Sequence, residues 1–219
     1  MFDFIKKVLF GQKNDPKTTN TNTSVTTATE PEMVYLIVGL GNIGNEYALT
    51  RHNVGFLAVD RLAAERELPF VTDRLGDVCE FRLKNKTVIL LKPSTYMNLS
   101  GKAVKYWVEK RRVPLENVLI IVDELSLPFS KLRIRGNGSA GGHNGLKSLE
   151  EVLGTQNYAR LRFGVSNEFS KGNQIDYVLG KWSDEEMQAL PVALDAVGAA
   201  IKSFVLTGLS ITMNLFNKK

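Results

Sequence analysis

Short runs of consecutive apolar residues alternate along this chain with longer stretches in which apolar residues recur every three or four positions. Runs such as Val34–Val38 and Val118–Val122 are typical of strands buried on both faces of a sheet. The amphipathic stretches predict helices, because a helical period places their apolar side chains on one face. Helices are predicted at Asn53–Glu67, Ser100–Arg112, Asn144–Leu153 and Ser183–Phe204, and further strands at Val78–Leu83, Thr87–Leu91, Lys131–Arg135 and Arg160–Val165.

The order of these elements predicts the fold class. Strands that alternate with helices favour a parallel sheet covered on both faces, whereas the two strands that flank Lys84-Asn85-Lys86 indicate an antiparallel hairpin. We therefore expect a single-domain three-layer α/β sandwich with a twisted, mixed and mainly parallel sheet. The long last helix opens with the capping-box pattern Ser183-Asp-Glu-Glu186, and Pro191 deep inside it predicts a break or kink.

The N-terminal segment differs in composition from the rest. Residues 11–32 are polar, rich in Thr and Asn and without apolar periodicity, which is typical of a disordered linker. Apolar residues ahead of it could form one or two amphipathic helical turns: Phe2, Phe4, Ile5, Val8, Leu9 and Phe10. We expect an N-terminal extension over residues 1–32, of a role that the sequence does not indicate, and the folded domain over residues 33–219.

Composition and charge limit the class of protein. The chain is 43% hydrophobic and 23% charged, as in an ordinary soluble domain, and no apolar run reaches the length of a membrane span. The start lacks a signal-peptide pattern, and the single Cys79 favours a reducing cytoplasm. The net charge of +5 is compatible with a polyanionic partner or with a solvated surface. Basic residues gather in two segments: Lys102, Lys105, Lys110, Arg111 and Arg112, and then Lys131, Arg133, Arg135 and Lys147.

A glycine motif offers an alternative function. Gly39-Leu-Gly41-Asn-Ile-Gly44 directly follows a predicted strand and matches the dinucleotide-binding fingerprint, with Asp60 in the place of the ribose-binding acid. That fingerprint needs a helix that starts within the glycine turn. Here the apolar stripe starts at Val54, and Asp60 lies inside the predicted helix. A dinucleotide-binding oxidoreductase is therefore the less favoured alternative, and we expect no cofactor.

The candidate chemistry lies in polar residues near the ends of the predicted strands. His52 and His143 are the two histidines of the chain, and imidazole is well suited to proton transfer near neutral pH. Asp123 ends an apolar strand, where the carboxyl ends of parallel strands meet in one crevice. The loops expected to meet there also carry three asparagines: Asn42, Asn98 and Asn144. An Asp–His pair without a clear nucleophile suggests activated water, and no spacing predicts a metal site.

Several motifs together resemble bacterial-type peptidyl-tRNA hydrolase. They are Val38-Gly-Leu-Gly-Asn-Ile-Gly44, Tyr47, Thr50-Arg-His-Asn53, Thr95-Tyr-Met-Asn98 with Ser100-Gly101, Asp123-Glu-Leu-Ser-Leu-Pro128 and Gly138-Ser-Ala-Gly-Gly-His-Asn-Gly145. The resemblance runs from about Met33 to the last helix, in the family's order and spacing. It implies an α/β enzyme that hydrolyses the ester bond between a peptide and tRNA.

The resemblance also implies roles for the matching residues. His52 would take a proton from water, Asp123 would hold and polarise His52, and Asn42 would position the water or the substrate carbonyl. Asn98 and Asn144 would hydrogen-bond the peptide or the terminal nucleotide, and the sequence does not decide which of them recognises the peptide amide.

Five further residues would surround that centre. Met97 would line the cleft, Tyr47 would help to shape it, and His143 would support the neighbouring asparagine. Arg135 and Arg162 would hold the 5′-phosphate region of tRNA, for which the guanidinium fork is suited. We expect a monomer. A relative that binds RNA without catalysis and an esterase of small molecules are the remaining alternatives.

Overall fold

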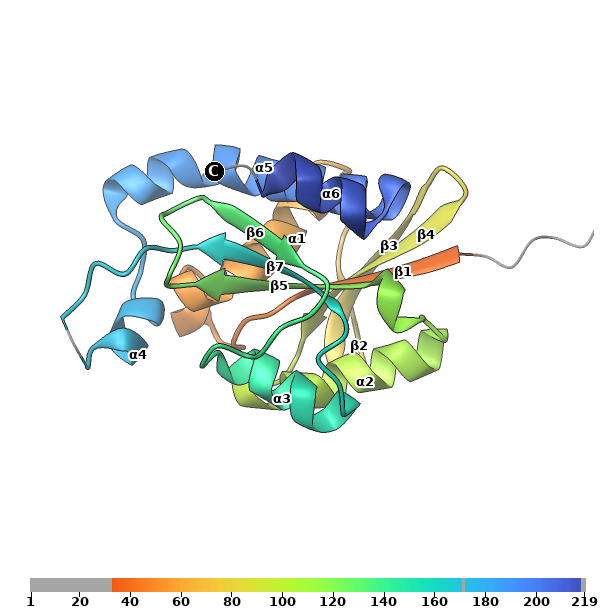
Figure 1. Ribbon diagram of the computed structural model, residues 1–219, viewed down its shortest axis with the longest axis horizontal. Coiled ribbons are helices and arrows are strands. Elements are labelled where there is room, and N and C mark those ends of the chain that lie inside the picture. The colour runs from red at the N-terminus through yellow and green to blue at the C-terminus, as the bar shows by residue number, and fades with distance from the viewer. Residues whose placement is uncertain (1–32, 171, 218–219) are drawn as a thin grey trace, which may run out of the picture. The chain divides into compact units, whose positions relative to one another are not determined.

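A seven-stranded sheet forms the middle layer of the computed structural model, which describes residues 33–170 and 172–217 (Figure 1). The strands lie in the order β2-β3-β4-β1-β5-β7-β6. Their bounds are Met33–Gly39 (β1), Val71–Asp73 (β2), Gly76–Leu83 (β3), Lys86–Pro93 (β4), Val118–Glu124 (β5), Leu132–Arg135 (β6) and Ala159–Gly164 (β7). The central strands β4, β1, β5 and β7 run parallel, and antiparallel pairs flank them on both sides.

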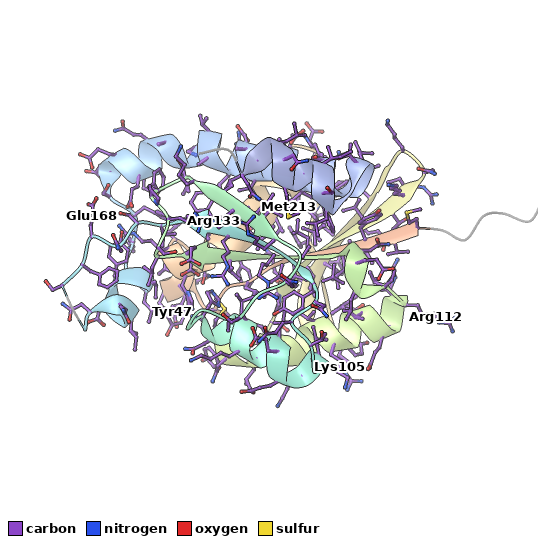
Figure 2. The ribbon with its side chains drawn as sticks, in the orientation of Figure 1. Tyr47, Lys105, Arg112, Arg133, Glu168 and Met213 are labelled. Carbon is purple, nitrogen blue, oxygen red and sulfur yellow. The ribbon has the colours of Figure 1, made fainter. Side chains whose placement is uncertain are left out.

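Helices cover both faces of this sheet. α1 (Val54–Ala64) and α5 (Asp184–Thr207) pack together on one face, and α2 (Ser100–Arg111) and α3 (Asn144–Leu153) pack together on the other. Figure 2 marks the two outer layers by Met213 on α6 (Leu209–Phe216) and Lys105 on α2, on opposite sides of the sheet. The predicted three-layer α/β sandwich with a mixed sheet is confirmed.

The core consists of two hydrophobic clusters, one on each face of the sheet. Ile37 and Ile121 belong to the cluster under α1 and α5, whereas Val38 and Ile120 belong to the cluster under α2 and α3. All four side chains are fully buried. Because successive strand residues point to opposite faces, a strand covered on both faces must be apolar throughout, which explains the continuous runs in the sequence.

The C-terminal region departs from the prediction. α5 begins with the predicted capping box between Ser183 and Glu186, but it continues without a break through Pro191. Because Pro191 has no backbone N–H, the carbonyl of Met187 lacks its helical hydrogen bond. Pro191 is exposed and Met187 is 40% exposed, so the missing bond lies on the solvent side of the helix. α5 is also not the last element. Gly208, with a φ of 83°, ends it and leads into α6.

α5 is a helix of the core. It has the length and apolarity that a membrane span needs, and no other described helix does. However, its buried face, which includes Val197, Ile201 and Phe204, belongs to the hydrophobic cluster that covers the sheet. We therefore infer that its apolar residues serve packing, as in the core helices of other α/β domains.

Two glycines bring α1 close to the ends of β1 and β5. A Cβ atom on Gly55 would lie 2.4 Å from the backbone of Leu40 and 2.6 Å from the carbonyl oxygen of Ile121, and one on Gly39 would lie 2.1 Å from the carbonyl oxygen of Gly55. Only glycine allows such an approach. α1 starts at Val54, after two short 3₁₀ turns, and not within the glycine turn as dinucleotide binding requires.

Some elements were not predicted, and others lie outside the structure. β2 and the short helix α4 (Gln174–Val178) did not show in the apolar pattern, because each has few residues and none of them is buried. The expected N-terminal extension over residues 1–32, with its helical turns and linker, lies outside the described residues.

Candidate active site

A cleft of about 520 Å³ opens at the carboxyl ends of the parallel strands. Its walls come from the loops after β1, β4 and β5, from β7, from the loop before α3, and from α4. Eight of the sequence-predicted residues line it: Asn42, His52, Met97, Asn98, Asp123, His143, Asn144 and Arg162. The expectation that strand ends converge on one crevice is therefore met in the structure.

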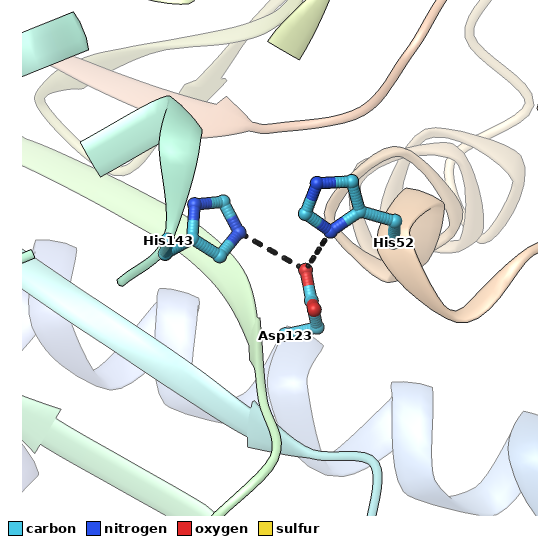
Figure 3. Close-up of side chains that lie close together, drawn as sticks. All are labelled: His52, Asp123 and His143. Carbon is cyan, nitrogen blue, oxygen red and sulfur yellow. Dashed lines mark hydrogen bonds and ion pairs between the residues drawn. The ribbon is translucent and has the colours of Figure 1, made fainter. Parts of the chain in front are cut away.

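Asp123 and His52 lie in direct hydrogen-bond contact, although the sequence separates them widely (Figure 3). Asp123, near the end of β5, is 5% exposed, and its Oδ1 lies 2.8 Å from Nδ1 of His52. A buried carboxylate accepts hydrogen bonds, so Nδ1 of His52 carries the ring proton and donates a hydrogen bond to Asp123. The other ring nitrogen, Nε2, is then left with a lone pair, as a general base requires.

Burial and charge act in opposite directions on this pair. Burial alone would lower the pKa of His52, but the charge of Asp123 and its hydrogen bond outweigh burial and raise that pKa above its ordinary value. Burial alone would raise the pKa of Asp123, but the two histidines hold it well below its usual range. Asp123 is therefore an anion at neutral pH, and His52 is a stronger base than an isolated imidazole.

His143 makes a second contact with the same carboxylate. Its Nε2 lies 3.0 Å from Oδ1 of Asp123, and its Nδ1 accepts hydrogen bonds from the backbone N–H groups of Gly145 and Leu146 as the N-cap of α3. The resemblance led us to expect that His143 supports its neighbour Asn144. In the structure, the ring of His143 contacts Asp123. Because Nδ1 accepts, Nε2 must carry the proton, so His143 donates to Asp123.

His52, Asp123 and His143 are also a group of potential metal ligands. Their candidate ligand atoms all lie within 4.8 Å of one another. Binding of a metal would compete with their hydrogen bonds. A neutral imidazole that binds a metal through one nitrogen carries a proton on the other. In His143 that other nitrogen, Nδ1, already accepts two backbone N–H groups. In this tautomer the proton of His143 lies on Nε2, which donates a hydrogen bond to Asp123.

Asn42 is held with its amide NH₂ group available. Its Oδ1 accepts the backbone N–H of Met97 at 2.8 Å. Its own backbone N–H and carbonyl are bound by the side chain of Asn53, at 2.8 and 2.9 Å. Asn42 can therefore donate toward the cleft through Nδ2, which suits a carbonyl oxygen that gains negative charge.

Asn53 is a site residue that sequence reasoning missed. It is 1% exposed, and it locks the loop of Asn42 against the turn that carries His52. The available signal was its place next to His52 in the motif Thr50-Arg-His-Asn53. A polar residue adjoining a candidate base is a reasonable candidate for its support.

Asn98, in the 3₁₀ turn Met97–Leu99, and Asn144, the first residue of α3, both line the cleft. Both side chains are exposed, and neither amide has a hydrogen-bond partner among the described residues. Gly141 and Gly142, with φ of 59° and 88°, form the turn that leads to His143 and Asn144. This turn needs glycine, because other residues rarely adopt those angles. Two unpaired amides remain to bind a polar ligand.

The remaining predicted residues are placed differently from one another. Arg162 lines the cleft, but its guanidinium donates to the carboxylate of Glu124 and, at 2.8 Å, to the carbonyl oxygen of Ser139. Arg135 is exposed at the end of β6 and lies outside the cleft lining. Tyr47 (Figure 2) also lies outside the lining, and its carbonyl accepts the hydroxyl of Thr50 at 2.9 Å.

The fold and the cleft are those of an α/β enzyme equipped for general-base chemistry on water. A carboxylate orients an imidazole, amide donors surround it, and the described residues that line the cleft include neither serine nor cysteine as a nucleophile.

Comparison with known proteins defines this enzyme further. Residues 36–219 match the family model of peptidyl-tRNA hydrolase. The peptidyl-tRNA hydrolase of Bacteroides fragilis is 57% identical over 187 residues, 85% of this chain and 100% of that protein, and that of Cytophaga hutchinsonii is 50% identical over the same length. The crystal structure of the Acinetobacter baumannii enzyme, 35% identical, superposes with a TM-score of 0.78 and covers 84% of this chain and 94% of that one. The chain belongs to the peptidyl-tRNA hydrolase family.

Proposed function

We propose that this chain hydrolyses the ester bond of peptidyl-tRNA and releases the peptide and free tRNA. Membership of the family supports the substrate. The observation that carries the mechanism is the bond between His52 and the buried carboxylate of Asp123 in a cleft lined by asparagine amides. This arrangement gives a base, an orienting group and oxyanion donors, which are the parts that ester hydrolysis by water requires.

The first step is attack by water on the ester carbonyl. Nε2 of His52 takes a proton from the water as its oxygen forms a bond to the carbonyl carbon. The proton that His52 gains makes the ring a cation, and Asp123 stabilises that cation through Nδ1. General-base assistance of this kind contributes about 10²–10⁴-fold in rate.

The second step is collapse of the tetrahedral intermediate. The NH₂ group of Asn42 donates to the oxyanion, a contribution of about 10²–10³-fold for one such donor. The ester C–O bond then breaks, and His52 returns its proton to the departing ribose oxygen. The products are a peptide with a free carboxyl group and tRNA with a free hydroxyl, and the enzyme regains its starting protonation.

Recognition of the peptide rests on the unpaired amides of Asn98 and Asn144. A peptidyl group offers an amide where aminoacyl-tRNA offers a charged amine. A site that binds an amide through hydrogen bonds discriminates strongly against a group that cannot form them.

Outside the cleft, Arg135 has an exposed guanidinium that can hold a tRNA phosphate. Arg162 forms part of the cleft wall. It can bind phosphate only if Glu124 releases its guanidinium.

The setting of the enzyme is part of the proposal. The buried free thiol of Cys79 suits a reducing cytoplasm. The tautomer of His143 supports a mechanism without a metal, and we propose that the chain acts as a monomer.

Turnover of N-acetyl-phenylalanyl-tRNA in the presence of EDTA tests the function, with phenylalanyl-tRNA as the control. We expect rapid release of N-acetyl-phenylalanine and little release of phenylalanine. Binding of the acetylated substrate without turnover would instead identify a relative that binds RNA without catalysis. Loss of turnover in EDTA, with recovery on adding a divalent ion, would overturn the mechanism without a metal.

A further inference from the structure

Arg51, the residue before the candidate base, is a buried arginine with several partners. It is 8% exposed, and its NH2 donates to Oε2 of Glu186 at 2.6 Å. Its NH1 donates to the carbonyl oxygen of Lys181 at 2.6 Å and to that of Tyr177 at 3.4 Å. The guanidinium also lies 4.3 Å from the centre of the Tyr177 ring. An arginine fork is well suited to join several acceptors in this way.

Two partners of Arg51, Tyr177 in α4 and Lys181 just after it, belong to the segment that forms one wall of the cleft, and the third, Glu186, lies in α5. α4 and the residues that follow it contribute Ile175, Val178 and Leu179 to the lining. The backbone N–H of Arg51 donates to the carbonyl oxygen of Gly180 at 3.1 Å, so main chain and side chain both bind this segment. The turn that carries His52 and the α4 wall are therefore joined through Arg51 and through the backbone bridge between Thr50 and Lys181.

α4 is also held by Tyr177, whose ring packs against Phe169 and against the hydrophobic core. None of its five residues is buried, and so short a helix is unstable alone. One other anchor is the hydroxyl of Tyr177, which donates to the carbonyl oxygen of Val165 at 2.7 Å. The His52 turn, by contrast, is held independently by Asp123 and by the side chain of Asn53. Loss of the Arg51 contacts should therefore displace the wall more than the base.

We propose that Arg51 is a positioning residue, which fixes the apolar α4 wall against the His52 turn and so determines how tightly the cleft holds the acyl group of the substrate. The inference rests on the proposed function, because it concerns the substrate of the same cleft. The wall presents Ile175, which is 70% exposed, together with Val178. Such side chains suit an apolar acyl group, which gains from leaving water.

The test compares Arg51→Lys and Arg51→Met with the unaltered chain on N-acetyl-phenylalanyl-tRNA and N-acetyl-glycyl-tRNA. We expect KM for the phenylalanyl substrate to rise about tenfold in Arg51→Met and less in Arg51→Lys, while kcat stays within about twofold. KM for the glycyl substrate should change much less, because glycine offers no side chain to the wall. The pH midpoint of kcat should not move, because Asp123 still holds His52.

Arg61→Met is the matched control. Like Arg51, Arg61 binds a carboxylate: its Nε and NH2 donate to Oδ1 and Oδ2 of Asp195 at 2.7 and 3.1 Å. Arg61 lies outside the cleft lining. The Arg61→Met substitution should leave KM for both substrates unchanged. Glu186→Gln provides a second test if the Arg51 variants fail to fold, and it should raise KM for the phenylalanyl substrate in the same direction.

The outcomes separate the inference from the proposed function. If the unaltered chain does not turn over either substrate, the proposed function fails. If it does, and the folded variants keep the same KM for both substrates, Arg51 does not set the wall. A fall in kcat with unchanged KM would also overturn the inference, because it would place the effect on the base.

Discussion

Replacing Asp123 by Asn tests the central pair most directly. Asn can still accept a hydrogen bond from His52 at the same place, so the change removes mainly the negative charge. At the observed 2.8 Å and an effective dielectric constant of about 20, a full charge pair is worth about 6 kcal/mol. Because about 1.4 kcal/mol corresponds to a factor of ten, losing it from the transition state lowers kcat by up to about 10⁴-fold. We expect a loss of about 10³–10⁴-fold.

The same variant should change the pH dependence. His52 must be neutral to act as a base, so activity rises with pH as the ring loses its proton. Asp123 raises the pKa of His52, so the acid limb of the unaltered enzyme should have its midpoint above 6.5. Without the carboxylate, burial prevails and lowers this pKa. The midpoint of the residual activity should therefore move to lower pH, while its plateau falls.

Single-turnover release of N-acetyl-phenylalanine, measured from about pH 5 to pH 9, gives both quantities in one experiment. Asp60→Asn is the matched control, because Asp60 also binds a cation, Lys92 at 2.6 Å, but lies outside the cleft lining. It should keep normal activity. If Asp123→Asn folds and keeps kcat within about threefold of the unaltered enzyme, the carboxylate does not stabilise the base and the reasoning is refuted.

Three further predictions concern the base, the tRNA contact and the fold. His52→Ala should lower kcat at least about a hundredfold while tRNA binding, measured by filter retention, persists; undiminished turnover would remove His52 from the mechanism. Arg135→Ala should raise KM and reduce its dependence on salt, and an unchanged salt slope would mean that the phosphate contact lies elsewhere. Asn217→Ala should reduce the free energy of unfolding in urea by about 1–3 kcal/mol, because the side chain makes hydrogen bonds of 2.7 and 2.9 Å to the backbone of Ile134. A change below about 0.5 kcal/mol would show that solvent replaces both bonds.

Much of the fold could be predicted because burial on both faces leaves a local record. The strands β1 and β5 are visible as apolar runs, and α3 was predicted with its observed bounds, Asn144–Leu153. α4 and β2 left no such record, since their residues are exposed. Of the break or kink predicted at Pro191, the break does not occur, because the packing of α5 on the sheet holds the helix together through the proline.

The candidate site could be predicted as a set of residues but not as a network. The position of Asp123 at a strand end is enough to expect it near His52. Nothing local shows that His143 shares the same oxygen, or that Arg162 is paired with Glu124. These contacts depend on how loops far apart in the sequence meet, and a motif carries residue types without their partners.

The division of labour between the two histidines follows from what the second nitrogen of each ring contacts. Both donate to Oδ1 of Asp123, so the carboxylate alone does not distinguish them. In His143 the second nitrogen accepts two N–H groups at the start of α3, and a proton there would break both bonds. In His52 no described residue occupies Nε2. The free Nε2 of His52 can take a proton without breaking a hydrogen bond of the fold, which supports our proposal that His52 is the base.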